Sequence, residues 1–169
     1  TNYPTRVDLG TGLTAKVVSC TYWTTCVILN DDSVKCWGAR GGNGFGSFVD
    51  VGDEPNEMGD NLPAIDLGTG IIPQSMVSGY LNTCVLFTNQ KMKCFGFDSS
   101  PGSGVLGYET TTNLGDGPGE LSDNLPFVEL GTGRTVKLLA GGYAHTCNCV
   151  ILDDDTTKCW GNGGTTGHG

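Results

Sequence analysis

One pattern occurs three times in this chain of 169 residues. Each copy has a short apolar run beside a cysteine, a polar turn, and a second short run that ends in Lys-Cys-aromatic-Gly. Two short β-branched or apolar runs around an Asn- or Asp-rich turn are typical of a β-hairpin. The same spacing recurs in three cysteine pairs: Cys26 and Cys36, Cys84 and Cys94, and Cys149 and Cys159. We therefore expect three hairpins built to one plan.

The position of each cysteine pair predicts a disulfide. The two cysteines are equidistant from the middle of their turn, so they face each other on neighbouring strands. Opposed residues in antiparallel strands have Cα atoms about 4.5–5.5 Å apart, which a disulfide can span. In the third repeat Cys147 is an alternative partner for Cys159, because a turn longer by two residues keeps the strand parity. The equal spacing favours Cys149.

Two cysteines, Cys20 and Cys147, remain after this assignment. Cys20 stands where the other repeats have Ser78 and Gly141, and Cys147 is the extra cysteine of the third repeat. In a head-to-tail assembly the third repeat of one copy would contact the first repeat of the next. We hypothesise that Cys20 and Cys147 form an intersubunit disulfide there. An intrachain bond and free thiols are the alternatives.

Composition narrows the class of protein. The 28 glycines, and the lack of any window with helical apolar periodicity, predict an all-β chain of short strands. No apolar run approaches the roughly 18 residues of a membrane span. Eight cysteines at repeated positions favour an oxidising compartment, so we expect a secreted or cell-surface protein.

A second marker, Leu-Gly-Thr-Gly, sets the repeat period. It begins at Leu9, Leu67 and Leu130, which predicts one repeat domain, 1–169, with units of approximately 1–60, 61–123 and 124–169. A strand-like run follows each marker, and a further strand is expected before it at 64–67 and 127–130. The last unit would be completed by the N-terminal strand or by a neighbouring copy.

The third repeat carries the most specific likeness. The run from Gly141 to Thr146, then an apolar strand, an Asp-rich turn and Lys-Cys-Trp-Gly-Asn ending at Asn162, resembles the repeat of the regulator-of-chromosome-condensation family. This resemblance implies a β-propeller, typically of seven blades with about four antiparallel strands each. The cysteines resemble the secreted, cysteine-containing variety. Three units are too few to close such a ring, so the resemblance implies that the array needs neighbours.

The sequence offers little for catalysis. Its two histidines, His145 and His168, lack any partner arrangement typical of a nucleophilic or acid–base site, and no dinucleotide or P-loop motif is present. We expect a protein that is not an enzyme and has no resident cofactor, with calcium as the exception considered next. The net charge of −9 argues against nucleic-acid binding.

Acidic turns between the repeats are candidate calcium sites. Carboxylates in a Gly- and Pro-rich turn can supply the oxygen ligands that Ca²⁺ prefers. The candidate ligands are Asp53, Glu57, Asp60, Asp116, Glu120 and Asp123. The alternative is a solvated turn in which the side chains bond their own backbone. His145, Cys147 and Cys149 alternate along one strand and are a weaker metal candidate.

Three functions are compatible with these features. We favour a non-enzymatic extracellular structural protein that self-associates into a filament or surface layer. The alternative is a fragment of a larger propeller that binds a protein or a carbohydrate. In that case the aromatic residues before each glycine, Trp37, Phe95 and Trp160, either pack between blades or form a ledge for a sugar. Nucleotide exchange on a small GTPase is a third reading, which only the family resemblance suggests.

Overall fold

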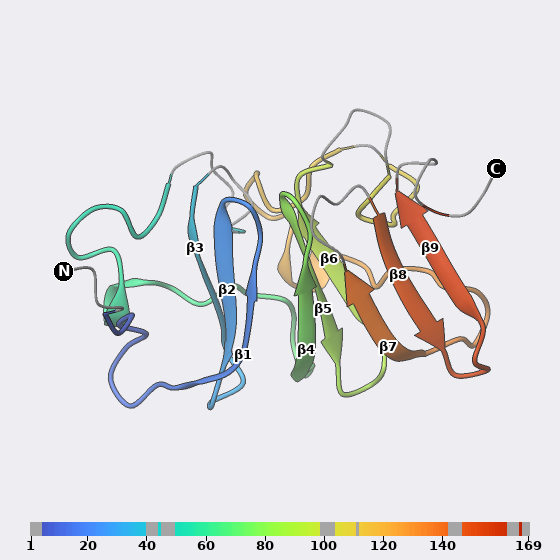
Figure 1. Cartoon of the computed structure of the whole chain (residues 1–169), viewed down its shortest axis with the longest axis horizontal. Helices are drawn as coiled ribbons and strands as arrows, with labels where there is room; N and C mark the ends of the chain where they lie inside the picture. The colour runs from blue at the N-terminus through green and yellow to red at the C-terminus, as the bar shows by residue number, and fades with distance from the viewer. Residues whose placement is uncertain are drawn as a thin grey trace.

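The computed structural model describes residues 5–39, 44, 50–98, 104–110, 112–141, 147–161 and 166. Within these residues the chain forms three antiparallel sheets of three strands each, which lie side by side in chain order (Figure 1). The strands are β1 (Ala15–Cys20), β2 (Thr24–Leu29), β3 (Val34–Gly38), β4 (Pro73–Ser78), β5 (Asn82–Phe87), β6 (Met92–Gly96), β7 (Val136–Gly141), β8 (Cys147–Leu152) and β9 (Thr157–Gly161).

The second and third strands of each sheet form the predicted hairpin. Its register places the two cysteines directly opposite each other in all three sheets. The structure contains the bonds Cys26–Cys36, Cys84–Cys94 and Cys149–Cys159, with Cα atoms 4.0–4.1 Å apart. Cys149 is thus the partner of Cys159, and Cys147 faces Gly161. The predicted all-β class, with three sheets and three stapled hairpins, is confirmed.

Glycine ends each hairpin because the strand leaves the sheet in a conformation that other residues rarely adopt. Gly38, Gly96 and Gly161 have φ angles of 115°, 109° and 121°. A Cβ atom on Gly38 would lie 2.2 Å from the carbonyl oxygen of Trp23. The Lys-Cys-aromatic-Gly pattern therefore ends in glycine for a steric reason.

The fourth strand expected in each blade and the strand expected before each Leu-Gly-Thr-Gly marker differ in the structure. The resemblance implied about four strands in a blade, but the outer position in two sheets is a single bridge, Gly38 to Val51 and Gly96 to Leu114. The segments 64–67 and 127–130 do not form strands. One backbone bond attaches each to the preceding hairpin, from Ile65 N to Val34 O (2.7 Å) and from Val128 N to Met92 O (2.9 Å). Lone bonds of this kind do not extend into a ladder.

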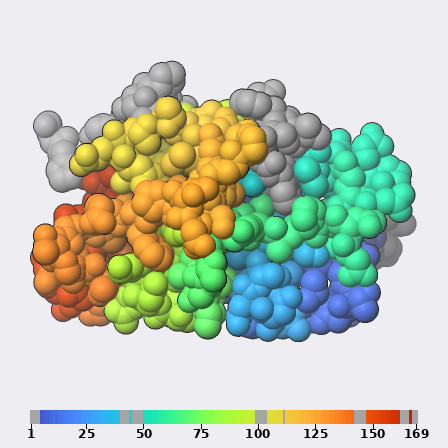
Figure 2. Space-filling view, turned by 180° about the vertical axis from the view of Figure 1, so that it is seen from behind, coloured from blue at the N-terminus to red at the C-terminus, as the bar shows by residue number. Residues whose placement is uncertain are grey.

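The segments after β3 and β6 instead turn through short 3-10 helices, η1 (Gly59–Asn61) and η2 (Ser122–Asn124). Figure 2 shows the green and orange parts of these segments lying across the molecule on the side away from the viewer of Figure 1, whereas η1 lies beyond the edge of the first sheet. No helix among the described residues is long and apolar enough to cross a membrane.

The core consists of two apolar clusters. One lies between the first and second sheets and the other between the second and third. The first strands β1, β4 and β7 also approach one another across the sheets. Each sheet is therefore stabilised mainly by its neighbours, as in repeat proteins whose units cannot bury a face alone.

Candidate binding surfaces at the two open sheet faces

Each sheet has a face that carries its disulfide, here called the disulfide face, and an opposite face, here called the reverse face. The disulfide face of the first sheet is buried to 2% exposure or less at Cys26, Ile28, Val34 and Cys36. The residues packed with it come from the second sheet and its flanking segments, and include Ile65, Leu67, Met76, Val85, Phe87 and Phe95. The contact thus joins a disulfide face to the reverse face of the next sheet.

The contact between the second and third sheets repeats this arrangement. The disulfide face contributes Cys84, Leu86, Met92 and Cys94. The next unit contributes Val128, Leu130, Val136, Leu139, Val150 and Leu152. Equivalent positions therefore make equivalent contacts at both junctions, and the chain contains two copies of one interface.

The third sheet has its disulfide face open. Cys149, Ile151 and Cys159 are partly exposed, although their counterparts in the first two sheets are buried. Thr157, which occupies the position of Val34 and Met92, is exposed. No described residue covers this face as the next sheet does at the two inner junctions.

The first sheet has the complementary surface open. Val18 is 63% exposed, whereas its counterparts Met76 and Leu139 are 6% and 8% exposed. In the segment before the sheet, Val7 is 52% exposed, whereas the equivalent Ile65 is 6% exposed. These residues occupy the positions that cover a preceding disulfide face at the inner junctions. The chain thus presents both halves of its own interface.

Polar groups at the junction follow the same rule. At the inner junctions the N–H of Ile65 donates to the carbonyl of Val34, and the N–H of Val128 donates to the carbonyl of Met92. Each acceptor is the first residue of the last strand in the preceding sheet. The matching donor in the first unit is the N–H of Val7, and the matching acceptor in the third sheet is the carbonyl of Thr157. A further blade on either side could therefore complete a specific hydrogen bond as well as apolar contacts.

A lysine precedes the second cysteine of each hairpin and has a role that sequence reasoning missed. Lys35 Nζ donates to the carbonyls of Leu9 and Gly59, both at 2.9 Å. Lys93 Nζ donates to the carbonyls of Leu67 (2.7 Å) and Ser122 (2.9 Å). Each buried ammonium therefore ties the Leu-Gly-Thr-Gly turn to the helical turn of the following segment. The recurrence of Lys-Cys was the available signal.

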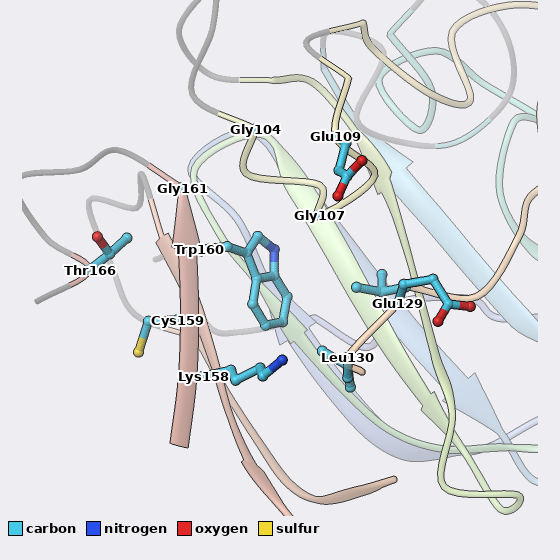
Figure 3. Close-up of a pocket in the computed structure, with 11 residues that line it drawn as sticks. Gly104, Gly107, Glu109, Glu129, Leu130, Lys158, Cys159, Trp160, Gly161 and Thr166 are labelled. Atoms are coloured by element: carbon cyan, nitrogen blue, oxygen red, sulfur yellow. The ribbon is translucent and has the colours of Figure 1, made fainter. Parts of the chain in front are cut away.

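Lys158 is the third such lysine and is exposed. It lines a hollow of about 420 Å³ beside β9, together with Glu109, Glu129, Leu130 and Trp160. Figure 3 shows Lys158 and Trp160 pointing from β9 toward Leu130. Among the described residues, no counterpart of the Gly59 or Ser122 carbonyl reaches Lys158. Because Lys158 and Trp160 alternate with Cys159 along β9, this hollow lies on the reverse-face side of the strand, away from the open disulfide face.

The acidic turns use their carboxylates to hold backbone. Glu57 accepts from the N–H groups of Gly52 (2.8 Å) and Glu54 (3.1 Å). Glu120 accepts in the same way from the N–H groups of residues 115–117. Asp116 accepts from the amide of Asn113. These bonds support the alternative stated above, an acidic turn that bonds its own chain.

Asp60 and Asp123 reach farther. Asp60 accepts from the N–H and the hydroxyl of Thr11, both at 2.7 Å. Asp123 makes the same pair of bonds to Thr69, also at 2.7 Å. In each case the backbone bond, followed by the hydroxyl bond, lowers the pKa of the carboxyl group. Both aspartates therefore fasten a Leu-Gly-Thr-Gly turn.

The calcium prediction stays a prediction. Within the described part of the chain, no three His, Cys, Asp or Glu side chains come together as a metal site. The six proposed ligands lie in two separate turns, and Asp53 is not brought to Asp60 as a shared ligand. His145 and His168 lie outside the described residues, so the weaker metal candidate at His145, Cys147 and Cys149 is not described in full.

Two of the three repeated aromatic residues, Phe95 and Trp160, pack between sheets. Phe95 is fully buried in the core between the first two sheets. Trp160 is partly buried, and its indole N–H donates to the carbonyl of Val105 at 2.9 Å. The ledge for a sugar that was considered at Trp37, Phe95 and Trp160 is therefore not formed, because Phe95 is inaccessible.

A different aromatic group is exposed. Tyr22 and Trp23 lie at the β1–β2 turn, and Tyr80 lies at the β4–β5 turn. The ring centroid of Tyr22 lies 4.8 Å from that of Trp23 and 5.3 Å from that of Tyr80. A tyrosine recurs before each hairpin in the sequence, at Tyr22, Tyr80 and Tyr143, although Tyr143 lies outside the described residues. The first two form one continuous surface with Trp23.

No protein-family model and no curated protein matches the sequence. Among solved structures, yeast RCC1 (Prp20) bound to Kap60 has a TM-score of 0.61 at 12% identity, over 92% of this chain and 31% of that one. Human WBSCR16 has a TM-score of 0.60 at 18% identity, over 89% and 34%.

The fold is that of RCC1-type β-propeller blades. A third similar structure is extracellular, the CRINKLY WD40 ectodomain of the Arabidopsis thaliana receptor kinase ACR4, with a TM-score of 0.53 at 19% identity, over 91% of this chain and 40% of that one. Each of the three sheets corresponds to one such blade. The chain spans about a third of the length of the structures that it matches. At these identities the likeness establishes the fold.

Proposed function

We propose that this chain is a non-enzymatic extracellular structural module that associates head to tail through its two open blade faces. The observation that carries the proposal is the pair of exposed half-interfaces. Val18 is exposed at a position that is buried in both other blades, and the third disulfide face is uncovered. The partner is a second copy, because each half matches a contact that this chain already makes with itself twice.

The geometry of such a contact is heterologous, since two different surfaces meet. A heterologous contact closes into a ring only when its rotation fits, and otherwise propagates into a filament. Burying one valine side chain contributes about 1.5–3 kcal/mol, so Val7 and Val18 together can stabilise a moderate contact. The three disulfides and the likeness to receptor ectodomains support an extracellular setting.

The test measures association in solution without any contribution from free thiols. The chain with C20S and C147S should show a mass in sedimentation velocity that increases with protein concentration. Adding Val18→Glu should abolish the increase, because a carboxylate would be buried at the junction. Ile72→Glu is the matched control, since Ile72 is 47% exposed just before β4 of the central blade, which lies away from both open faces. Equal behaviour of the two variants would refute the proposed contact.

A second function is favoured by a separate observation, the exposed aromatic group at Tyr22, Trp23 and Tyr80. Exposed aromatic clusters mark surfaces that bind proteins or stack on sugars. Under this alternative the chain is part of a larger propeller that binds a ligand through its turns. Screening against glycan and protein arrays, with Trp23→Ala as the negative variant, tests it. Binding that Trp23→Ala does not change would count against this surface.

A further inference from the structure

Two thiols flank the proposed junction, one on each open surface. Cys20 is exposed at the end of β1, and Cys147 is partly buried at the start of β8. Cys147 lies two residues before Cys149, so its side chain belongs to the open disulfide face of the third blade. Cys20 lies at the end of the strand that carries Val18. The two inner junctions show how close such a contact would bring the two sulfur atoms.

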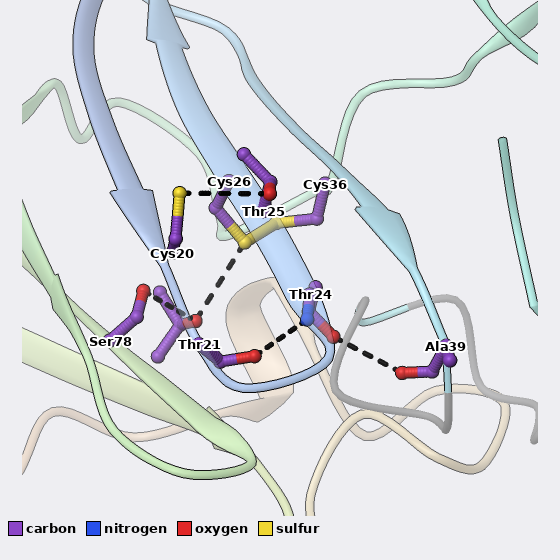
Figure 4. The surroundings of a disulfide bond; sticks show 9 residues. Cys20, Thr21, Thr24, Thr25, Cys26, Cys36, Ala39 and Ser78 are labelled. Atoms are coloured by element: carbon purple, nitrogen blue, oxygen red, sulfur yellow. Dashed lines mark hydrogen bonds between the residues drawn. A yellow bond between two sulfur atoms is a disulfide. The ribbon is translucent and has the colours of Figure 1, made fainter. Parts of the chain in front are cut away.

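The junction between the first and second blades gives the first answer. Ser78 holds the position of Cys20 in the second blade. Its Oγ lies 3.2 Å from the hydroxyl oxygen of Thr83, and that oxygen lies 3.7 Å from Cys26 Sγ in the preceding blade. Figure 4 shows Ser78 and the Cys26 sulfur linked through this one hydroxyl. The position of Cys20 therefore faces the disulfide face of the preceding blade across a single side chain.

The junction between the second and third blades gives an independent answer. Gly141 holds the position of Cys20, and Asn82 holds the position of Cys147. A Cβ atom on Gly141 would lie 3.6 Å from Asn148 Oδ1, and Asn148 Nδ2 lies 3.4 Å from Asn82 Oδ1. The amide of Asn148 therefore touches both positions. At this inner junction one amide group therefore separates the two positions that carry cysteine at the open ends, and the atoms nearest to such a Cβ belong to Val77 of the preceding blade, 3.0 Å away.

At the open junction Thr25 would take the place of Asn148. Its hydroxyl already lies 3.7 Å from Cys20 Sγ within the first blade. Thr25 has a shorter side chain than Asn148, so it leaves space between the two flanking positions that two sulfur atoms can occupy. The Sγ atom of Cys147 extends about as far from its strand as the Cγ atom of Asn82. The sequence change at all three positions favours a direct contact between sulfurs.

We propose that Cys20 of one copy and Cys147 of the next form a disulfide that locks the head-to-tail contact. This inference rests on the proposed function. A small-molecule disulfide of the compartment is the oxidant: it accepts two electrons and two protons from the two thiols and is released as two thiols. The bond would convert a reversible contact into a covalent one.

The experiment compares C20S, C147S and their equimolar mixture, each as the full chain incubated with oxidised glutathione. Each single variant alone should remain a monomer on a non-reducing denaturing gel, because it lacks one of the two different thiols. The mixture should give a dimer and nothing larger, since each copy then offers one reactive surface. The unmodified chain should give a ladder that reducing agent collapses to a monomer.

Two outcomes separate this inference from the proposed function. A mixture that stays monomeric on the gel, while the C20S/C147S chain associates in sedimentation, overturns the crosslink alone. A C20S/C147S chain that does not associate, together with no dimer in the mixture, overturns both. Dimers in either single variant at the level of the mixture would show symmetric pairing and also overturn the crosslink. Val18→Glu should lower the crosslinked fraction about tenfold or more, and Ile72→Glu in the central blade should leave it unchanged.

Discussion

The buried lysines Lys35 and Lys93 each hold two backbone segments of their own repeat together. Lys93 is 3% exposed, and burial lowers the pKa of its ammonium group, which the carboxylates of Asp123 and Asp66 partly oppose. The two carbonyls that it binds belong to segments 26 and 29 residues away. A charged donor in this position satisfies backbone groups that would otherwise lack a partner.

Replacing Lys93 with methionine should lower the free energy of unfolding by about 2–4 kcal/mol, because two buried carbonyls lose a charged donor while the aliphatic stem is kept. Urea unfolding followed by tryptophan fluorescence measures this change. Lys158→Met is the matched control, since Lys158 has the same sequence context but is exposed. Its effect should stay within about 0.5 kcal/mol. A similar loss in both variants would contradict the role given to the two carbonyls.

Asp60 and Asp123 predict a dependence of stability on acid pH. Their pKa values are lowered in the folded chain by hydrogen bonds from Thr11 and Thr69. A lowered carboxyl pKa contributes stability that is present above the unfolded value of about 3.9 and is lost as pH falls through the folded value. The thermal midpoint should therefore fall as pH decreases below about 4.

The variant D60N/D123N isolates this contribution, because asparagine keeps an acceptor but does not titrate in this range. Below pH 4 its midpoint should fall less steeply than that of the unmodified chain, measured by circular dichroism between pH 6 and pH 2.5. Thr69→Val removes one of the donors to Asp123 and should move the slope in the same direction. Parallel curves for all three chains would show that other carboxylates control the acid response.

At the scale of the element, each hairpin combines local pairing with a disulfide across it. Each bond spans ten residues of sequence, so it removes about 2–3 kcal/mol of chain entropy from the unfolded state in the loop-closure model. The central pair, Cys84 and Cys94, is also fully buried against the third blade. The disulfide of the second blade therefore contributes to core packing as well as lowering the entropy of the unfolded chain. The disulfide of the third blade acts mainly through the entropy of the unfolded chain.

This difference predicts that C84A/C94A destabilises the chain more than C149A/C159A does. The end pair should cost about 2–3 kcal/mol, and the central pair more, because its removal also leaves a cavity in the core. Urea midpoints at matched protein concentration measure both. Non-reducing peptide mapping of the unmodified chain should recover all three ten-residue pairs. Equal midpoints for the two variants would show that burial of the central sulfurs adds nothing.

The hairpins could be predicted from the sequence because their determinants are local. Strand parity and the symmetric cysteine pairs fix the register over about fifteen residues, and the structure has that register. The prediction of strands at 64–67 and 127–130 was wrong. Each segment makes a single backbone hydrogen bond to the preceding hairpin, and an apolar run in the sequence does not show how many such bonds the hairpin offers. The aromatic surface at Tyr22 and Tyr80 depends on two turns 58 residues apart in sequence. The recurrence of the tyrosine was visible in the sequence, but its exposure in the folded chain was not.

At the scale of the whole molecule, the three blades form an open array with different surfaces at its two ends. The reverse face of the first blade is exposed at Val18, and the disulfide face of the third is exposed around Ile151. In a stacked array the stability of each unit depends on its neighbours, so end units are the least stable. Contact between copies would therefore stabilise the first and third blades as well as join them.

The net charge of −9 predicts how this association responds to salt. Copies with the same charge repel one another, and the surfaces that would meet at the junction are apolar at Val18 and Ile151. Raising the ionic strength from about 10 mM to about 150 mM shortens the screening length from roughly 30 Å to roughly 8 Å, which weakens the repulsion and leaves the apolar contact unchanged.

Sedimentation equilibrium of the C20S/C147S chain should therefore give a tighter dissociation constant at the higher salt concentration. The same chain with Val18→Glu should remain monomeric at both concentrations. Weaker association at higher salt would contradict an apolar junction, because it would show that attraction between opposite charges holds the copies together.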